Sequence, residues 1–382
     1  MNVVRLLWLS LSVVLWACGG GASSDSDGGT TADAGSDGGS TADAGNPIPD
    51  AGTAWDAVGA LLDARVADAG SDKVPGLGLA VYDAQDRKVY EHMVGDFTPD
   101  RRVAVASSSK MIAGAVIFDV IRQGLLSLDS TTGEVLGWTG DKAHITLRHL
   151  LSFTSGMQNE HLCTLQPDLT LAECVAIIAT TPQVAPPGTR FDYGSTHLEV
   201  AARMAEVKTG KTWNQLFRET LANPLGLPPE VTYFTLPRKA QGTSNPLIAG
   251  GLRTSMNEYA PLLALVFHKG SYAGLVRGTP ELFDAQTREP YPGVVIGNSP
   301  VKDLGLDYRY GLTAWLHCDT PADGCGTISS PGAFGWTPWM DRETGYYAVL
   351  GMQLDRNDEG VVGFSVDLMG DLQPLIRAAL GH

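Results

Sequence analysis

The sequence predicts an α+β fold, with an antiparallel sheet built from both chain ends, flanked by helices, and a mainly helical second lobe. Strand patterns occur early in the folded part and return near the C-terminus, and the long stretch between them is mainly helical. Strands at both ends with helices between them imply one shared sheet. We therefore expect a cleft between the sheet and the helical lobe, where a small-molecule site is typical.

The first elements are a helix around residues 55–69 and two strands at 76–82 and 88–94. The strands enclose a turn at residues 83–86, which predicts a hairpin. Residues 111–121 are apolar on nearly every side, and Gly124 closes the segment. This pattern predicts a helix buried in the middle of the molecule.

The middle of the chain, to about residue 236, is broken by stretches rich in proline and glycine. Between these breaks we expect helices at 146–153, 171–180, 197–208 and 212–222. Strand patterns return at 310–317, near 333–340 and at 346–353. A last helix is expected at 368–380.

Residues 1–54 predict export and a tether. Arg5 precedes an apolar run that is too short to cross a bilayer comfortably, so residues 1–18 are expected to be a signal peptide. Ala17 before Cys18 resembles the bacterial lipoprotein cleavage site, which implies a lipid on Cys18 and a membrane anchor in the cell envelope. Because Trp16 is unusual there, plain cleavage to a periplasmic or secreted protein stays open. Residues 19–54 are mostly Gly, Ser, Thr, Ala and Asp, which predicts a flexible acidic tether ahead of a folded domain at 55–382.

Composition narrows the classes of function. The chain has 382 residues and 43% hydrophobic content, enough for a substantial core. Its formal net charge of -15 argues against nucleic acid as a partner. No Cys/His cluster indicates a metal.

With Cys18 assigned to the lipid, the other cysteines form two local pairs, Cys163 with Cys174 and Cys318 with Cys325. Both pairs would be disulfides in an oxidising envelope. Buried free thiols are the alternative, because sequence alone does not fix connectivity.

Ser107 and Lys110 form an S-x-x-K pair where the buried helix is expected to begin. On a helix they lie one turn apart on the same face. A neutral lysine amine there can take the serine proton, while the helix N-terminus stabilises the developing anion. The alternative is a capping serine followed by a surface lysine. A second S-x-x-K, from Ser299 to Lys302, lies among glycines and prolines, and we expect a loop there.

The S-x-x-K segment is the first of several short sequence blocks along the chain. They read SSSK at 107–110, GLLSLD at 124–129, ITLRHLLSFTSG at 145–156, PGTRFDY at 187–193, PLGL at 224–227 and AGGLRTS at 249–255. This series resembles the serine β-lactamase and penicillin-binding-protein-like family, especially its class C, D-aminopeptidase-like and esterase branches. The resemblance covers most of residues 74–380. It implies the β-lactamase/transpeptidase-like α+β fold and a serine hydrolase domain at 55–382.

The resemblance also implies roles for individual residues. Ser107 would be the nucleophile, Lys110 its activating partner and Tyr193 a second proton carrier. The backbone N–H groups of Ser107 and Ala333 would form the oxyanion hole. For His197, one helical turn past Tyr193, packing is favoured over a triad because the base role is already filled. No cofactor or metal is implied.

The sequence departs from the family pattern at two positions. Ser195 stands where the Y-x-N element has Asn, and Ser330 stands where K-T-G or H-x-G has Lys or His. We expect four substrate-binding residues, Ser195, Ser330, Gly332 and Trp336, with Gly332 letting the substrate approach the strand. For Trp336, as for Trp339, core packing is the alternative.

The absence of the Lys or His that Ser330 replaces affects which substrates the site is expected to bind. It removes a charge-assisted contact to a substrate carboxylate, worth about 1.5–3 kcal/mol. Arg253 or His317 could restore positive charge, although a surface role is favoured for Arg253. Cleavage of an ester or amide without a required carboxylate is therefore favoured over penicillin hydrolysis.

The sequence thus predicts an exported serine hydrolase that cleaves small-molecule ester, amide or peptide substrates through an acyl-enzyme on Ser107. Two alternatives stay open. One is a β-lactamase or D-alanyl carboxypeptidase acting on cell-wall substrates. The other is a catalytically weakened binding protein on the same fold, suggested by Ser195 and Ser330.

Overall fold

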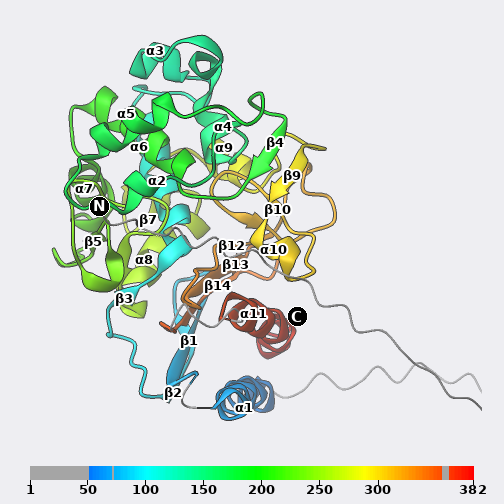
Figure 1. The fold of residues 1–382 in the computed structure, drawn as a ribbon. Helices are drawn as coiled ribbons and strands as arrows, with labels where there is room; N and C mark the ends of the chain where they lie inside the picture. The colour runs from blue at the N-terminus through cyan, green and yellow to red at the C-terminus, as the bar shows by residue number, and fades with distance from the viewer. Residues whose placement is uncertain (1–50, 71–72, 355–360) are drawn as a thin grey trace, which may run out of the picture. The chain divides into compact units, whose positions relative to one another are not determined.

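A computed structural model describes residues 51–70, 73–354 and 361–382, so the expected signal peptide, Cys18 and tether residues 19–50 lie outside the described residues. Its main sheet has seven strands in the order β10-β11-β12-β13-β14-β1-β2. The two chain ends meet where β1 pairs antiparallel with β14 (Figure 1). The strands are β1 (Gly76–Asp83), β2 (Lys88–Gly95), β10 (Arg309–Tyr310), β11 (Trp315–Leu316), β12 (Thr327–Ser329), β13 (Thr337–Asp341) and β14 (Tyr346–Gly351). This arrangement confirms the predicted sheet from both chain ends.

Strand β1 is buried along its whole length because both faces of the sheet are covered. Successive side chains of a strand point to opposite faces. Leu77, Leu79 and Val81 belong to the core shared with the terminal helices, and Ala80 and Tyr82 belong to the core of the helical lobe. The expected hairpin with β2 is present.

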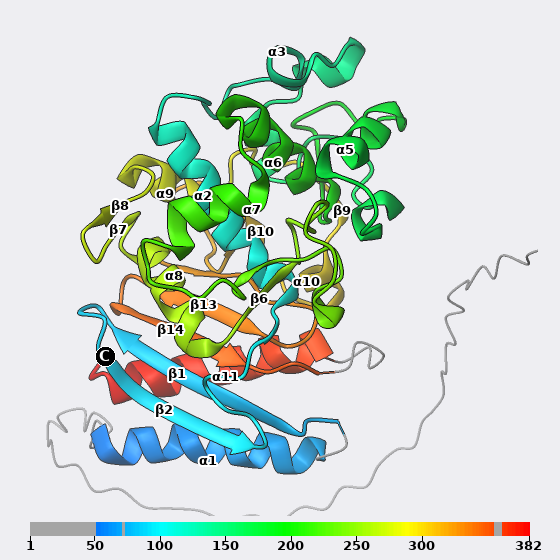
Figure 2. The ribbon, with the colours of Figure 1, turned by 90° about the vertical axis from the view of Figure 1, so that its left-hand side faces the viewer.

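The two terminal helices, α1 (Ala51–Ala69) and α11 (Val361–Ala379), lie side by side, and in Figure 2 α11 lies behind strand β1 and α1 lies at the bottom. Leu62 of α1 and Leu372 of α11 are fully buried in the same core. Helix α1 begins at Ala51, so the last residues that we assigned to the tether, 51–54, are helical. No helix within the described parts of the chain has the length and apolar character needed to cross a membrane.

The second lobe is mainly helical, as predicted. Its helices are α2 (Ser109–Arg122), α3 (Thr132–Leu136), α4 (Leu147–Leu151), α5 (Leu171–Thr180), α6 (Thr196–Thr209), α7 (Trp213–Phe217), α8 (Met256–Phe267), α9 (Pro280–Gln286) and α10 (Pro300–Asp303). Short helical turns occur at Ala106–Ser108, Gly140–His144, Leu162–Leu165, Arg218–Ala222 and Pro237–Lys239. Small sheets are formed by β3 (Val103–Ala104), β4 (Arg190–Asp192), β5 (Thr232–Tyr233), β6 (Leu252–Thr254), β7 (Ser271–Tyr272), β8 (Leu275–Val276) and β9 (Val295–Asn298).

Helix boundaries follow local capping chemistry. Helix α5 spans the predicted residues, because the Thr170 side chain accepts the backbone N–H of Glu173 and the Glu173 carboxylate accepts that of Thr170. Helix α8 begins with the same type of capping box, although the sequence analysis did not predict this helix.

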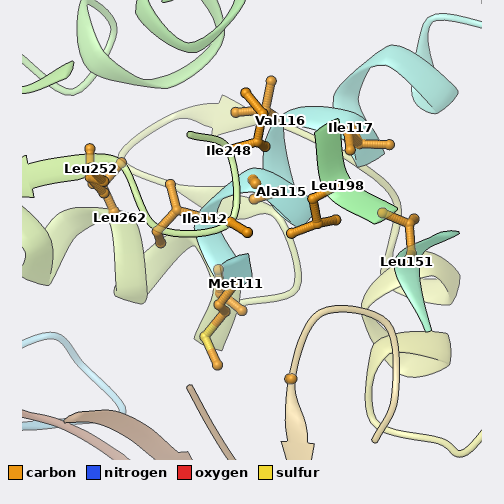
Figure 3. Packing of buried hydrophobic residues seen from close by; sticks show 14 of the residues in the cluster. Met111, Ile112, Ala115, Val116, Ile117, Leu151, Leu198, Ile248, Leu252 and Leu262 are labelled. Atoms are coloured by element: carbon orange, nitrogen blue, oxygen red, sulfur yellow. The ribbon is translucent and has the colours of Figure 1, made fainter. Parts of the chain in front are cut away.

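Helix α2 is the buried helix that the sequence predicts. All its residues from Ser109 to Val120 are buried. Figure 3 shows its side chains Met111, Ile112, Ala115, Val116 and Ile117 packed among Leu151, Leu198, Ile248, Leu252 and Leu262. Because its surroundings fix the helix along its length, its N-terminal end has a defined position.

One expected strand, at 310–317, is wrong. The chain forms two short strands there, β10 and β11, which pair with each other. Between them Thr313 has a φ of 65°, and the Gly311 N–H donates to the Ala314 carbonyl. The turn packs against α2, since a side chain at Gly114 would lie 2.2 Å from Thr313 Oγ1. Packing against a helix distant in sequence therefore decides this turn.

Both cysteine pairs form disulfides in the structure. The Cα atoms are 5.2 Å apart in Cys163–Cys174 and 5.6 Å apart in Cys318–Cys325. The first disulfide ties the turn at Leu162–Leu165 to helix α5. The second follows β11 and precedes β12.

Candidate active site

Ser107 lies in the 3₁₀ turn Ala106–Ser108, which leads directly into α2. Ala106 has a φ of 47°, a left-handed conformation that residues other than glycine rarely adopt. This turn places the half-buried Ser107 at the N-terminal end of a 14-residue helix. Unpaired N–H groups and the helix dipole favour negative charge at such an end.

The turn is anchored to the segment that precedes β13. Ser330 Oγ donates to the Ser107 carbonyl at 3.0 Å, and Ser108 Oγ donates to the Ser330 carbonyl at 2.7 Å. A side chain at Gly332 would lie 2.3 Å from the Val105 carbonyl oxygen. Ser330 and Gly332 therefore hold the nucleophile turn, and neither lines the cavity beside Ser107. The expectation that they contact substrate is not met.

Lys110 is buried, with 3% of its surface exposed. Its Nζ donates to Ser107 Oγ at 2.9 Å and to the Ala249 carbonyl at 2.8 Å. It also lies 4.6 Å from the centroid of the Tyr193 ring. Lys110 Nζ thus faces a hydroxyl, a carbonyl and an aromatic ring.

Tyr193 is fixed through its backbone and its ring. Its N–H donates to the Asn298 carbonyl at 2.9 Å, and its carbonyl accepts Nδ2 of Asn159 at 2.9 Å and of Asn298 at 2.7 Å. The ring stacks on Trp315 with centroids 5.1 Å apart and meets Phe153 edge-on at 5.4 Å. The structure therefore brings Ser107, Lys110 and Tyr193 together.

The two expected oxyanion donors lie beside the same cavity. Ser107 and Ala333 both line it. Among the described backbone hydrogen bonds, none uses the N–H of either residue. Both groups can therefore donate to a developing oxyanion.

Ser195 leads to a residue that the sequence analysis missed. The Ser195 N–H donates to Glu160 Oε1 at 3.1 Å, and Ser195 Oγ donates to Glu160 Oε2. Both residues line the cavity. Glu160 belongs to none of the family-like blocks, and only the fold brings it to Ser195, so no sequence signal marks it.

The cavity beside Ser107 has a volume of about 590 Å³, which is ample for a small organic substrate. Its wall carries Ser107, Lys110, Glu160, Ser195 and Ala333. Apolar side chains also line it, namely Leu162, Leu165, Leu236, Pro237, Leu247 and Phe334. Leu162, beside the disulfide at Cys163, is 78% exposed. The cavity thus combines a polar wall with exposed apolar surface.

Glu199 lies buried behind the Lys110 contact. Its Oε1 accepts the Ile248 N–H at 2.8 Å, and the next residue, Ala249, gives its carbonyl to Lys110. Burial raises the pKa of the Glu199 carboxyl well above its usual value, although the backbone N–H donors and Lys110 oppose this. Glu199 therefore favours its protonated form and holds the segment that positions Lys110.

His197 does not contact Ser107. Its Nε2–H donates to the Asp192 carbonyl at 2.8 Å, so its Nδ1 accepts from Ser155 Oγ at 2.8 Å. Burial lowers the pKa of His197 to about 4. The geometry matches the structural role that the sequence analysis favoured.

Neither residue suggested as a replacement cation is available to substrate. Arg253 donates to the carbonyls of Pro237 at 2.7 Å and Arg102 at 3.2 Å. His317 Nε2 lies 2.6 Å from Ser329 Oγ, and burial lowers its pKa to about 3. His317 is therefore neutral, and Arg253 holds the backbone.

The two tryptophans also lie away from the cavity. Trp336 is fully buried and meets the Tyr259 ring edge-on at 5.7 Å. Trp339 is fully buried and donates from Nε1 to Tyr346 Oη at 3.1 Å. The expectation that Trp336 binds substrate is wrong, because its ring is enclosed by the core. Phe334 supplies the aromatic surface of the cavity instead.

The second S-x-x-K is also not the expected loop. Ser299 precedes the one-turn helix α10, whose first residue is Pro300. Lys302 on this helix is exposed. Neither Ser299 nor Lys302 lines the cavity beside Ser107. Within the described ranges, no group of His, Cys, Asp and Glu side chains forms a metal-binding cluster.

Comparisons with known proteins agree with this architecture. The β-lactamase family model matches residues 60–363. Penicillin-binding protein 4 of Amycolatopsis lactamdurans is 33% identical over 181 residues, which cover 44% of this chain and 46% of that protein. The chain spans less than half the length of the curated relatives that it matches.

Solved structures share the fold. A crystal structure described as a candidate β-lactamase, from Bacteroides dorei DSM 17855, matches with a TM-score of 0.69 and 30% identity, covering 80% of this chain and 97% of that chain. Unliganded simvastatin synthase from Aspergillus terreus matches with a TM-score of 0.63 and 18% identity, covering 84% of this chain and 98% of that chain. At this lower identity, only the fold is shared.

Proposed function

The chain belongs to the β-lactamase family of serine hydrolases, and we propose that it cleaves ester or amide bonds through an acyl-enzyme on Ser107. The observation that carries this proposal is the 2.9 Å contact between Lys110 Nζ and Ser107 Oγ. The contact lies at the N-terminal end of α2, beside a cavity of about 590 Å³. Nucleophile, proton carrier and substrate space therefore coincide.

In the first step, Ser107 Oγ attacks the substrate carbonyl carbon, and its proton passes to Lys110, which acts as the neutral amine and becomes the ammonium. Tyr193, whose ring lies against the Lys110 ammonium, helps to deliver a proton to the departing alcohol or amine. The carbonyl oxygen becomes an oxyanion that accepts the N–H groups of Ser107 and Ala333. Collapse of this intermediate breaks the ester or amide bond and leaves the acyl group on Ser107.

In the second step, water attacks the acyl-enzyme. Lys110 and Tyr193 take the proton from that water and return one to Ser107 Oγ. The products are a carboxylic acid and free enzyme. No cofactor is needed for either step.

The substrate is proposed to lack a required carboxylate. Ser330 replaces the usual third-motif cation and donates to the Ser107 carbonyl. Arg253 and His317, the two replacements that the sequence suggested, are engaged elsewhere. Arg238 and Lys239 line the cavity from the turn Pro237–Lys239, so a substrate that carries a carboxylate is the competing class. The exposed leucines of the cavity support an apolar group on one side of the scissile bond. Hydrolysis of β-lactams or D-alanyl peptides is the second candidate, supported by the penicillin-binding relative.

The proposal is tested by intact-protein mass spectrometry after exposure to a panel of p-nitrophenyl esters and to a penicillin. We expect an acyl mass shift with the esters in the wild type and in Ser299→Ala, and none in Ser107→Ala. A shift with penicillin alone would favour the second candidate. Identical results for wild type and Ser107→Ala, together with no labelling by a fluorophosphonate, would support a binding protein on this fold.

We also propose that the protein is exported and lipid-anchored through Cys18. The sequence of residues 1–18 and the disulfides Cys163–Cys174 and Cys318–Cys325 support this location. Metabolic labelling with an alkyne fatty acid should mark the wild type and not Cys18→Ser. Release of unlabelled protein that begins at Cys18 would indicate plain cleavage instead.

A further inference from the structure

We propose that Glu160 binds a protonated amine carried by the substrate, near the bond that Ser107 attacks. The inference deepens the proposed function and rests on it. Glu160 lines the same cavity as Ser107 and Lys110, and it is the only acidic side chain among the described residues that line it. Substrate that enters this cavity therefore meets one acidic side chain, together with the basic side chains of Lys110, Arg238 and Lys239.

The segment that carries Glu160 is built into the site. Its neighbour Asn159 donates from Nδ2 to the Tyr193 carbonyl at 2.9 Å and accepts the Thr196 N–H on its own carbonyl at 3.0 Å. Gly194, between them, has no side chain, and a Cβ there would lie 2.2 Å from the Asn159 carbonyl oxygen. Residues 159–160 are thus docked on the segment that holds Tyr193, which gives Glu160 a defined position relative to the nucleophile.

The hydrogen bonds of Glu160 leave room for a ligand. Ser195 donates once to each carboxylate oxygen, from its N–H to Oε1 and from its hydroxyl to Oε2. An ionised carboxylate offers about four acceptor positions, so about two remain. The side chain is exposed, and none of the ion pairs found between described residues includes it. Its oriented negative charge is therefore free to bind a cation.

The position is also close enough to the catalytic groups to act on the reacting end of a substrate. Glu160, Ser107 and Lys110 all line the same cavity of about 590 Å³. Ser195, the partner of Glu160, lies two residues beyond Tyr193. We therefore place the substrate amine against Glu160 and the scissile carbonyl against Ser107 within this one cavity.

Other charges in the cavity point to a competing class of substrate. Arg238 and Lys239 also line it, and Arg238 lies over the Phe334 ring at 5.1 Å. These side chains belong to the turn Pro237–Lys239, whereas Glu160 belongs to the segment docked on Tyr193. We assign amine recognition to Glu160 because Ser195 orients its carboxylate through two hydrogen bonds. An anionic substrate is included in the test as the competing outcome.

The test compares p-nitrophenyl esters of β-alanine, butanoic acid and succinic acid, whose acyl ends are an ammonium, a methyl and a carboxylate. For wild type, we expect kcat/KM for the β-alanyl ester to exceed that for the butanoyl ester by about tenfold or more, as for a charge-assisted hydrogen bond. In Glu160→Gln this ratio should fall about tenfold. Asp168→Asn, which removes an exposed acid that does not line the cavity, should keep the ratio.

Three results would overturn the inference. The first is an unchanged ratio of the two kcat/KM values in Glu160→Gln. The second is an equal loss of kcat/KM on the β-alanyl and butanoyl esters, which would mean that Glu160 only positions Ser195. The third is a wild-type preference for the succinyl ester. A binding experiment distinguishes failure of this inference from failure of the proposed function. Calorimetry with Ser107→Ala should show tighter binding of β-alaninamide than of butanamide, with the difference lost in Ser107→Ala/Glu160→Gln. If no ester is cleaved, the proposed function fails, and the calorimetry still decides the role of Glu160.

Discussion

Ser107 with Lys110 and Ser299 with Lys302 have the same S-x-x-K spacing and different surroundings. Lys110 is buried and donates to Ser107 Oγ at 2.9 Å. Lys302 is exposed, and among the described hydrogen bonds none joins it to the Ser299 side chain. Both serines precede a helix, so helix initiation alone does not create the pair.

The difference lies in what packs around each helix. Helix α2 is 14 residues long and buried along most of its length, and Ala249 and Tyr193 cover its Lys110. Helix α10 has 4 residues and ends before Leu304. A buried lysine must find partners for its charge, whereas an exposed lysine is hydrated. Burial of the lysine therefore turns this spacing into a candidate catalytic pair.

The largest expected effect separates the two serines. Ser107→Ala should lower kcat for p-nitrophenyl ester hydrolysis at least about 1000-fold, because no acyl-enzyme can form. Ser299→Ala should stay within about twofold of wild type, since Ser299 lies outside the cavity. Steady-state kinetics with matched folding checks by circular dichroism give the answer. Equal losses in the two variants would contradict the assignment.

The second-largest expected effect separates the two lysines, Lys110 and Lys302, by the loss of kcat on substitution. Lys110→Met removes the proton carrier and keeps the length of the side chain, so we expect a loss of about 100- to 10,000-fold in kcat. Lys302→Met should leave ester hydrolysis close to wild type, because the lysine is exposed and does not line the cavity. Burst kinetics will show whether acylation or deacylation is slowed. A Lys110→Met enzyme with wild-type kcat would remove Lys110 from the mechanism.

Ser330→Ala should have a smaller effect on ester hydrolysis, and it tests how the turn that carries Ser107 is held in place. The variant loses one hydrogen bond to the Ser107 carbonyl, worth about 0.5–1.5 kcal/mol. We expect kcat/KM to fall about threefold to tenfold and the KM for a neutral ester to change little, since Ser330 does not line the cavity. Ser330→Thr, which keeps the hydroxyl, should recover most of the loss. A large rise in KM for carboxylate substrates alone would instead place Ser330 against the substrate.

Sequence reasoning reached the parts of the site that local patterns encode. Helix α2, the hairpin of β1 and β2, and the Ser107–Lys110 spacing follow from periodicity, turn residues and ordered motifs. The place of Phe334 in the cavity wall and the full burial of Trp336 in the core do not follow from such patterns. Residues so close in the chain differ only in what the fold packs against them. Gly332 illustrates the same limit, since its missing side chain accommodates a backbone carbonyl and not a substrate.

Glu160 could not be predicted for a related reason. Its partner Ser195 lies 35 residues away in the chain. An isolated glutamate in a loop carries no periodic or motif signal, and its position depends on how Asn159 docks against Gly194. Tertiary packing therefore determines the part of the site expected to select the substrate, whereas local sequence determines the nucleophile.

The smallest expected effect concerns Glu199. Its carboxyl holds the segment Ile248–Ala249, whose Ala249 carbonyl accepts a hydrogen bond from Lys110. This support belongs to the S-x-x-K pair at Ser107. Burial raises the pKa of Glu199 above its usual 4.5. Between pH 4.5 and that raised pKa, the folded protein keeps a proton that the unfolded chain has released. This group therefore lowers the free energy of unfolding by about 1.4 kcal/mol for each pH unit in that window.

Glu199→Gln keeps an acceptor for the Ile248 N–H and has no proton to lose. Its melting temperature relative to wild type should therefore rise as the pH increases from 4.5 to 7. Asp303→Asn, an exposed position beside Lys302, should show no such trend. If the melting temperature of Glu199→Gln relative to wild type stays constant over this range, the carboxylate is already ionised in the folded protein. The negative charge of Glu199 would then act on Lys110 in addition to the hydrogen bond that Lys110 donates to the Ala249 carbonyl.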